Sequence, residues 1–432
     1  MFINTVLHRI QEFLKPITEN SIVLQKLDWL IGANVFFVIF SSTVAQSDTI
    51  GYFAIFAILL TVIKLLTKTG EKFEMTFSDK FLLVYMIFVL ISVAGSSLLY
   101  LSLKGFFKTL TYIGFYISVI HYLKDNKDKI KYIFLAIALC VCYETVFAFL
   151  QNAGAVEEIS GWQDMSHLNP EEVMTRVYGT IKPFNPNLFG GYMLAAIPAF
   201  IPISFINKKL MLPSLILGIL SVAALVLAGC RGAYIGFFFE CFIITIILYN
   251  IIKSDYKKMF SAFIVVCISF FTILIFSTSA LRARIFSIFA MRSDSSNSFR
   301  FNVYNSCINM FKDNWLLGIG CGNQNFREIY GLYMRTGFDA LSAYNIYLET
   351  AVESGIFALI TFLAFICINI YKAVKYVLFD KSVEAVYVLT ALISITGILF
   401  HGFVDTVFFR PQIQFLFWIM IAIIRVITIN KD

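Results

Sequence analysis

Charged residues are scarce in this sequence. Asp, Glu, Lys and Arg make up 14% of its 432 residues, while 59% are hydrophobic and the mean hydropathy is +0.81. So little charge cannot cover a water-soluble surface, which excludes the ordinary soluble globular classes. The sequence therefore predicts an all-α, polytopic membrane protein.

Common functional signatures are also missing. The glycines of the segment 317–322 have no Lys-Ser or Lys-Thr after them and no strand before them, which excludes a P-loop or a dinucleotide fold. We expect a tight backbone turn there instead.

The eight cysteines form no disulfide framework, and Cys230, Cys307 and Cys321 lack the spacing of a zinc site, so neither metal nor cofactor is expected. The polar stretch from His8 to Asp28 is unlike a cleavable signal peptide, so the first helix is predicted to be an uncleaved anchor.

Long hydrophobic runs dominate the chain. A helix needs about 20 apolar residues to cross the hydrocarbon core, and we count about twelve such runs. They are centred near Phe36, Leu59, Val89, Gly114, Leu139, Ala196, Leu220, Ile243, Ser269, Phe362, Ile393 and Met420. The seventh and eighth are separated only by the segment 229–232, so one long bent helix is an alternative for that pair.

The positive charges are distributed unevenly between the two sides of the predicted membrane. One side carries 21 of the 34 lysines and arginines. The other carries 13, nine of them in two long loops, where charge has little orienting force. The positive-inside rule therefore places both termini in the cytoplasm, and Arg231 and the loops 151–182 and 281–341 on the outer side. The same distribution argues against a nucleic-acid-binding surface.

The predicted spans divide the chain into five segments. These are residues 1–150 with helices 1–5, an extracytoplasmic loop at 151–183, residues 184–280 with helices 6–9, a large extracytoplasmic loop at 281–341, and residues 342–432 with helices 10–12. The first segment is poor in polar residues and is expected to be scaffold.

The large loop is expected to carry the function. Phe301, Tyr304, Ile308 and Phe311 recur at helical spacing within it, which predicts an interfacial helix resting on the bilayer. The segment 295–298 supplies residues that favour a helix start, which would place Arg300 in the first turn.

Two arginines on the predicted outer side are candidate anion ligands. An arginine at the bilayer centre costs about 2.5–3.5 kcal/mol, so Arg231 must reach the interface, a water-filled cavity or an anion. A snorkelling position at a helix end is the alternative. Arg300, near a helix N-terminus, could fork onto phosphate oxygens. Asn187 follows a proline- and glycine-rich turn and is expected to be a helix cap or a ligand-facing amide.

Ionisable residues near the predicted outer side are candidate bases. His401 and Asp405 are spaced to share one helix face, where the carboxylate would orient the imidazole for general-base chemistry. A structural link between helices is the alternative. Glu144 lies inside a predicted span, where a carboxyl is costly; it could be functional, or hydrated or neutral.

Several short motifs resemble the O-antigen ligase and polymerase superfamily. They are Cys-Arg-Gly-Ala around Arg231, Arg300 itself, Trp-Leu-Leu-Gly-Ile-Gly-Cys-Gly-Asn at 315–323, and Tyr-Asn-Ile-Tyr-Leu at 344–348 with Glu-Ser-Gly at 353–355. The likeness spans roughly 183–411. Within the superfamily the sequence is most similar to the cyanobacterial inorganic carbon (bicarbonate) transporter branch, through the motifs at 184–188, 339–344 and 401–406.

The resemblance implies a metal-independent glycosyltransferase of about twelve helices at the outer face of the cytoplasmic (inner) membrane. Such an enzyme moves a glycan from a polyprenyl (undecaprenyl) diphosphate carrier to a glycan or lipid acceptor hydroxyl, as in lipopolysaccharide and polysaccharide biosynthesis. Arg231 and Arg300 match the paired arginines of the family, and Asn187 and Asn345 are further candidate ligands of the diphosphate. The family's base is a histidine at the position of Tyr344, whose ordinary pKa near 10 makes a poor base.

Replacement bases and other functions remain open at this point. Glu349, Glu353, or His401 with Asp405 could take the place of the missing histidine. A bicarbonate transporter would use the same arginines, although no inverted repeat is visible. A non-enzymatic protein that binds lipid-linked glycans is the third alternative.

Overall fold

The computed structural model describes residues 2–155 and 174–429. Within these ranges the chain forms helices and no β-strand, which confirms the all-α prediction. The first half contains α1 (Phe2–Asn20), α2 (Ile22–Gln25), α3 (Leu27–Val44), α4 (Ser47–Thr67), α5 (Phe77–Ala94), α6 (Leu99–Asp125), η1 (Lys127–Lys129), α7 (Ile130–Asn152), α8 (Pro186–Ala196), η3 (Ile197–Ala199) and α9 (Phe200–Ile206). The second half contains α10 (Lys208–Leu227), α11 (Arg231–Ile251), α12 (Ser254–Ser277), α13 (Ser279–Phe286), η4 (Met291–Ser293), α14 (Ser295–Asn314), α15 (Asn323–Tyr330), α16 (Ile346–Phe379), α17 (Val383–His401), η5 (Val407–Phe409) and α18 (Pro411–Thr428).

The helices bear out a polytopic membrane protein. Eleven helical segments among the described residues are long and apolar enough to cross a bilayer. The remaining predicted span, centred on Gly114, corresponds to the longer and more polar α6. Helices α10 and α11 are separate, because the chain turns at Gly229 with a φ of 59°. The single bent helix considered for this pair is therefore wrong.

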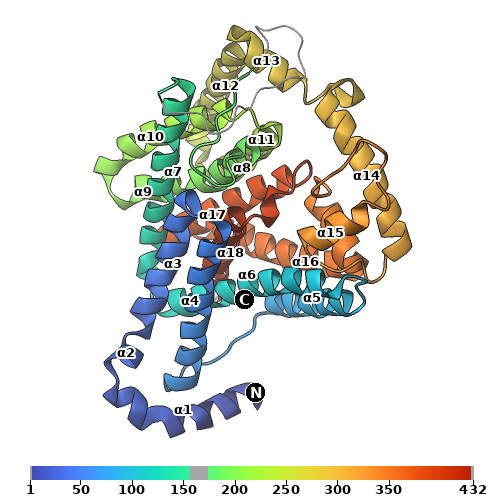
Figure 1. Ribbon diagram of the computed structural model, residues 1–432. Helices are drawn as coiled ribbons and strands as arrows, with labels where there is room; N and C mark the ends of the chain where they lie inside the picture. Colours follow the sequence, from blue (N-terminus) through green and yellow to red (C-terminus); the bar gives the residue numbers. More distant parts are fainter. Residues whose placement is uncertain (1, 156–173, 430–432) are drawn as a thin grey trace.

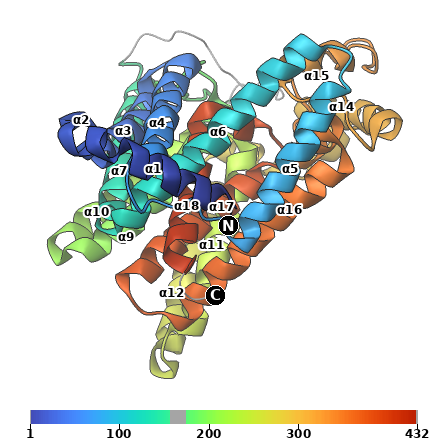
Figure 2. The ribbon, with the colours of Figure 1, turned by 90° about the horizontal axis from the view of Figure 1, so that it is seen from below.

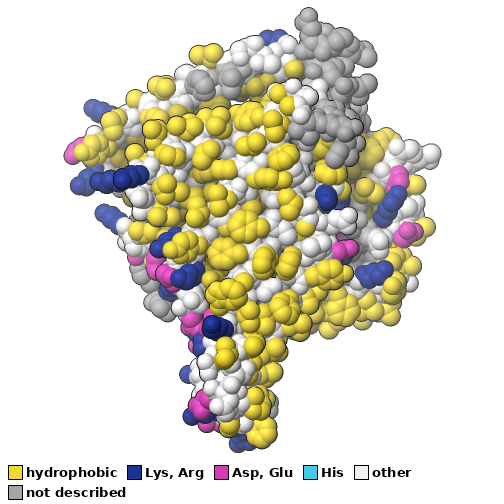
Figure 3. All heavy atoms as spheres, turned by 60° about the vertical axis from the view of Figure 1, so that its left-hand side comes forward, with side chains coloured by type: hydrophobic (Ala, Val, Ile, Leu, Met, Phe, Trp, Pro, Cys, Tyr) yellow, Lys and Arg dark blue, Asp and Glu magenta, His cyan; other side chains and the backbone are white. Residues whose placement is uncertain are grey.

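The last helix forms the centre of the bundle. Every residue of α18 from Gln412 to Thr428 is buried, and α18 contacts α6, α17, α16 and α8. Figure 2 shows α17 and α18 between the group α3, α4, α7 and the group α5, α6, α16. The outside of the bundle is apolar over a broad face, with charged side chains at its margins, as Figure 3 shows. The one charged side chain of α18, Arg425, lies 2.8 Å from Asp79 Oδ2, and this pairing allows the otherwise mainly apolar helix to be buried on all sides.

The glycine-rich segment 317–322 forms a turn that packs against a break in α16. The break is at Gly355, whose φ is 80°, and it exposes backbone groups of the preceding turn. Ile319 N donates to Val352 O at 3.0 Å, and Gly320 N donates to Glu353 O at 2.9 Å. A Cβ on Gly318 would lie 2.4 Å from Glu353 O, so only glycine allows this approach. The connection before α15 is thereby fixed to α16.

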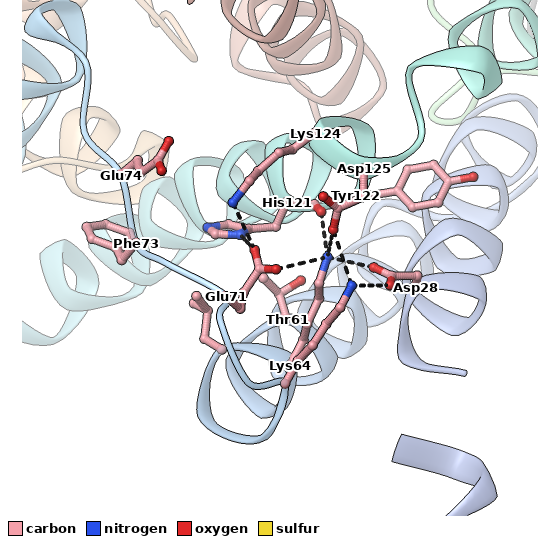
Figure 4. Close-up of polar contacts among 12 residues, drawn as sticks. Asp28, Thr61, Lys64, Glu71, Phe73, Glu74, His121, Tyr122, Lys124 and Asp125 are labelled. Atoms are coloured by element: carbon pink, nitrogen blue, oxygen red, sulfur yellow. Dashed lines mark hydrogen bonds and ion pairs between the residues drawn. The ribbon is translucent and has the colours of Figure 1, made fainter. Parts of the chain in front are cut away.

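The opposite end of the bundle holds a buried cluster of charges (Figure 4). Lys64 is fully buried, and its Nζ lies 2.6 Å from Asp28 and 3.2 Å from Asp125. Glu71 approaches the same Nζ at 3.8 Å and lies 2.7 Å from His121 Nδ1. These residues belong to α3, α4, α6 and the connection after α4. Several connections that we predict to be cytoplasmic therefore meet at one place.

Two predicted helix starts need correction, while one predicted loop is largely not described. The loop 151–183 falls largely on 156–173, outside the described residues. In the large loop, α14 is capped by Asp294, whose side chain accepts from Asn297 N, so Arg300 lies in the second turn and not the first. The cap of α8 is Asn185, which accepts from the backbone amides of Asn187 and Leu188, so Asn187 itself is not the cap.

Candidate functional site

Arg231 and Arg300 line the same cavity. The cavity has a volume of about 140 Å³ and lies between the start of α11, the segment 288–304 and the turn after α17. Its other lining residues are mainly apolar: Gly232, Ile235, Ile288, Met291, Asn297, Phe301, Tyr304 and Val404. Two guanidinium groups from different helices thus face one small space with apolar walls.

Arg231 is the first residue of α11 and is buried. The turn at Gly229 ends α10 and places the guanidinium toward the large loop. Its Nη1 lies 2.9 Å from Asp294 Oδ1 and donates to Ser287 Oγ at 3.0 Å. The Asp294 side chain also caps α14, so one carboxylate both starts that helix and forms an ion pair with Arg231. The snorkelling alternative does not describe this buried arrangement.

Arg300 keeps part of its hydrogen-bonding capacity unused. Its Nη1 donates to Ser296 Oγ at 3.0 Å, and its Nη2 lies 3.9 Å from Asp405 Oδ2. The guanidinium carbon is 5.6 Å from the centre of the Tyr344 ring, within the range of a cation–π contact. Its buried Nε has no hydrogen-bond partner among the described residues. A buried donor without a partner is costly unless a ligand or water supplies an acceptor.

Asp405 does not lie on the helix that carries His401. Helix α17 ends at His401, and Gly402 is its C-cap. Beyond it, Asp405 Oδ1 accepts from the backbone amides of Thr406 and Val407. Its Oδ2 accepts from Asn187 Nδ2 at 3.0 Å and faces Arg300. The predicted His401–Asp405 pair on one helix face is therefore wrong, because the glycine ends the helix between the two residues.

His401 is held in a close contact between helices. A Cβ on Gly232 would lie 2.4 Å from its ring, and one on Gly191 would lie 3.0 Å away, so the imidazole fills the space that these glycines leave. Its Nε2 is 3.7 Å from Cys230 Sγ. His401 is buried and is not among the residues that line the cavity.

Tyr344 lies directly beside Arg300. Its backbone has a φ of 51°, in the left-handed region that residues other than glycine rarely adopt. Tyr304 donates from its hydroxyl to Tyr344 O at 3.1 Å and so helps to hold this backbone. Burial, and secondly the charge of Asp405, raise the pKa of the Tyr344 hydroxyl above its ordinary value. The hydroxyl is therefore protonated at neutral pH and cannot accept a proton there.

The remaining predicted residues of this region support the backbone. Glu349 is buried, and its Oε2 accepts from Ala343 N at 2.8 Å, which fixes the turn that carries Tyr344. Asn345 caps α16 by accepting from Tyr347 N and Leu348 N, and it donates to Phe403 O. Glu353 lies at the break in α16, where its carbonyl accepts from the glycine-rich turn. None of these three residues lines the cavity.

Three residues of the site were missed by sequence reasoning. Arg176 donates to Ala228 O and to Asn187 Oδ1, and Arg284 donates from its Nε to Gly229 O at 2.7 Å. Both arginines hold the turn between α10 and α11, and Arg176 also holds Asn187 in place. Asp294, the partner of Arg231, could have been found as an aspartate directly before a predicted helix start.

Other features of the described residues do not compete with this site. A hollow of about 450 Å³ near the connection of α11 and α12 is lined by apolar residues and Lys253, without converging polar groups. Within the described ranges, no group of three or more His, Cys, Asp or Glu side chains is placed to hold a metal ion. Glu144 accepts from both the backbone amide and the hydroxyl of Thr180, and so it holds the chain after the outer loop.

The comparison with protein families bears on this part of the chain. Residues 216–363 match the family described as O-Antigen ligase. The match supports membership of the O-antigen ligase superfamily. It includes Arg231, Arg300, Tyr344, Glu349 and Glu353, while the residues around Asn187, His401 and Asp405 lie outside it. The matched segment thus contributes both arginines of the cavity. A comparison with curated proteins finds no match.

Proposed function

We propose that the protein binds the diphosphate of a polyprenyl-linked glycan between Arg231 and Arg300 and transfers the glycan to an acceptor hydroxyl. The observation that carries this proposal is the convergence of two guanidinium groups, from α11 and α14, on one apolar-walled cavity. A guanidinium forks onto two phosphate oxygens, and two of them offset the charge that develops on a leaving diphosphate.

Arg231 and Arg300 differ in how closely each guanidinium is paired with partners within the protein. Arg231 is paired with Asp294 at 2.9 Å, which keeps its buried charge from being isolated. The contact of Arg300 with Asp405 is longer, 3.9 Å, and its Nε lacks a partner among the described residues. Arg300 is therefore the arginine with donors available for a phosphate oxygen. Arg231 would add a second positive charge from the other wall.

The apolar walls suit a lipid carrier. Ile235 belongs to the span α11, while Ile288 and Phe301 come from the large loop. The cavity therefore lies between a membrane-spanning helix and the loop. The isoprenyl chain would remain in the bilayer beside α11, with its diphosphate reaching the arginines. We place this site on the outer face of the cytoplasmic membrane, following the distribution of positive charge.

Asp405 is the residue that we assign as the base. Asp405 does not itself line the cavity, but its Oδ2 lies 3.9 Å from Nη2 of Arg300, which does, and its carboxylate is oriented by Asn187 and two backbone amides. In the proposed step the acceptor oxygen attacks the anomeric carbon and gives its proton to Asp405. The bond from that carbon to the diphosphate oxygen breaks, and the diphosphate leaves on its carrier. Tyr344, held near Arg300, would orient the substrate without taking the proton.

An assay on the reconstituted protein tests this function. Liposomes that contain the protein are supplied with polyprenyl-diphosphate sugar and an acceptor glycan or lipid, and glycan transfer is measured. The proposal predicts transfer by the natural protein, and loss of transfer with retained donor binding in Asp405→Asn. Binding without transfer by the natural protein would instead support a lipid-linked-glycan binding protein and would contradict the enzymatic step.

Inorganic carbon transport is the second candidate function. It is favoured by the small volume of the cavity, about 140 Å³, which suits a small anion between two guanidinium groups. Uptake of labelled bicarbonate into the same liposomes distinguishes it. Uptake that is lost in Arg231→Ala and Arg300→Ala, without any transfer of glycan, would replace the glycosyltransferase proposal.

A further inference from the structure

Helix α1 has an apolar face that nothing in the described chain covers. Ile3, Val6, Phe13 and Ile17 follow one another at intervals of three, seven and four residues, so they share one side of the helix. All four are exposed, Phe13 by 81% and Ile17 by 59%. Large side chains this exposed, in a contiguous row, mark a binding surface.

A second face of α1 fixes the helix to the body of the protein. Gln11 donates from Nε2 to Leu65 O at 2.8 Å and to Glu71 O at 2.9 Å, and its Oε1 accepts from Gly70 N. Asn4 pairs in both directions with the backbone of Phe73, at 3.0 and 3.1 Å. The helix is therefore held in one rotational orientation. Glu71 belongs to the buried charge cluster, so the attachment point is itself rigid (Figure 4).

The third face of α1 is polar. His8, Glu12, Lys15 and Glu19 lie roughly opposite the apolar row by helical spacing, and Glu12, Lys15 and Glu19 are exposed. Figure 3 shows hydrophobic and charged side chains on different sides of the lower projection, which includes α1. Helix α1 thus has three sides: one faces the protein, one is apolar and one is polar. This pattern is expected of a helix that lies in the plane of a membrane surface.

The neighbouring residues place α1 at the level of the membrane interface. Figure 1 shows α1 crossing below the lower ends of α3 and α4, at a large angle to both helices. Trp29, in the first turn of the span α3, is 70% exposed, and tryptophan is enriched where the hydrocarbon core meets the head groups. Ile22 and Val23 of α2 are also exposed and continue the apolar surface from α1 to the span. The uncovered face is therefore continuous with the lipid-facing surface of the bundle.

We propose that the apolar face of α1 lies in the boundary between head groups and acyl chains of the leaflet at this end of the bundle. The partner is the lipid bilayer itself. Arg9 and Lys15 are balanced by Glu12 and Glu19, so apolar burial and not attraction to anionic head groups holds the helix there. Attachment through Gln11 fixes the charge cluster and the ends of α3 and α4 at the depth of the interface.

Quenching of a fluorescent side chain tests this proposal in the full-length protein. An environment-sensitive fluorescent amino acid is introduced at Phe13, on the apolar face, or at Glu12, on the polar face, with one protein molecule in each lipid nanodisc. We expect lipids brominated on the acyl chain to quench the probe at position 13 at least about threefold more than the probe at position 12, and aqueous iodide to show the reverse order. Equal access of iodide to both positions would overturn the proposal.

Two further measurements exclude other occupants. If a second copy covered the face, protection of position 13 would appear only in discs that hold two copies, which would also overturn the proposal. Replacing zwitterionic by anionic lipid is expected to change the quenching ratio by less than about twofold, because the charges of α1 balance. A larger change would show that head-group charge, and not apolar burial, holds the helix. Both labelled proteins must melt at the same temperature as the natural protein.

Discussion

The side-chain amide of Asn187 donates a 3.0 Å hydrogen bond to Asp405, 218 positions further along the chain. The oxygen of the same amide accepts from Arg176 at 2.6 Å. Asn187 therefore links a cation that precedes α8 to an anion that follows α17. This link orients the carboxylate that faces Arg300, and it connects the first half of the chain to the arginine cavity.

Removing this bridge is expected to destabilise the protein. Asn187→Leu keeps a similar volume but leaves Arg176 and Asp405 each without one partner, at a cost of about 1–3 kcal/mol in the free energy of unfolding. Denaturant titration in detergent measures the change. Asn250→Leu is the control, because Asn250 is exposed and bonds only within its own helix, and it should change stability by less than about 0.5 kcal/mol. Equal stability of the two variants would refute the bridging role of Asn187.

The glycine-rich turn gives a prediction with a matched control. Gly318 and Gly337 both have positive φ angles, 74° and 86°, so alanine costs about 1–2 kcal/mol at either position through backbone strain. Only at Gly318 would the added Cβ also collide with the backbone of α16, since nothing lies within 4 Å at Gly337. Gly318→Ala should therefore lower the melting temperature clearly more than Gly337→Ala. Similar shifts would show that the turn does not pack on α16 as described.

Glu144 is expected to hold the chain in place and not to take part in chemistry. Its carboxylate accepts two hydrogen bonds from Thr180, so Glu144→Ala should cost about 1–3 kcal/mol in stability. A double-mutant cycle with Thr180→Ala should give a coupling energy of at least about 0.5 kcal/mol. Glycan transfer by the folded fraction should be unchanged. Full stability combined with lost transfer would assign Glu144 to the reaction instead.

The two candidate bases near Arg300 differ in their expected pH behaviour. The raised pKa of Tyr344 keeps its hydroxyl protonated from pH 6 to 9, so Tyr344→Phe should retain the pH profile of transfer over that range. Asp405→Asn removes the proposed base and should lower the transfer rate by about 10²–10⁴-fold. Initial rates of transfer across this pH range provide the measurement. A loss of transfer above neutral pH that is specific to Tyr344→Phe would assign the proton to the tyrosine.

The sequence predicted the features that depend on composition and local pattern. The long apolar runs gave the helical spans, and the glycines at 318–322 correctly indicated a backbone turn. The distribution of positive charges predicts Arg231 and Arg300 on one side of the membrane, which agrees with their shared cavity. Each of these inferences needs only neighbouring residues or a simple count.

The features that were missed depend on contacts between distant segments. Arg176 and Arg284 bind the backbone carbonyls of Ala228 and Gly229, which no side-chain pattern reveals. The four-residue spacing predicted that Asp405 shares a helix with His401. Spacing does not show where a helix ends, and α17 ends at His401 with Gly402 as its C-cap. The stretch from His8 to Asp28 is polar and mixed in sequence, and the apolar face of α1 becomes clear only once its hydrogen-bonded face is known.

Binding of a polyprenyl-diphosphate sugar to the reconstituted protein is the sharpest test of the diphosphate site between Arg231 and Arg300. Arg300→Lys, Arg300→Ala and the double variant Arg231→Ala, Arg300→Ala are compared with Arg327→Ala, which removes an exposed arginine of the same loop that pairs only with exposed Asp339. We expect natural affinity for Arg327→Ala, partial loss of affinity for Arg300→Lys, and a loss of at least about 100-fold for the double variant. Unchanged affinity in a folded double variant would contradict the proposed diphosphate site.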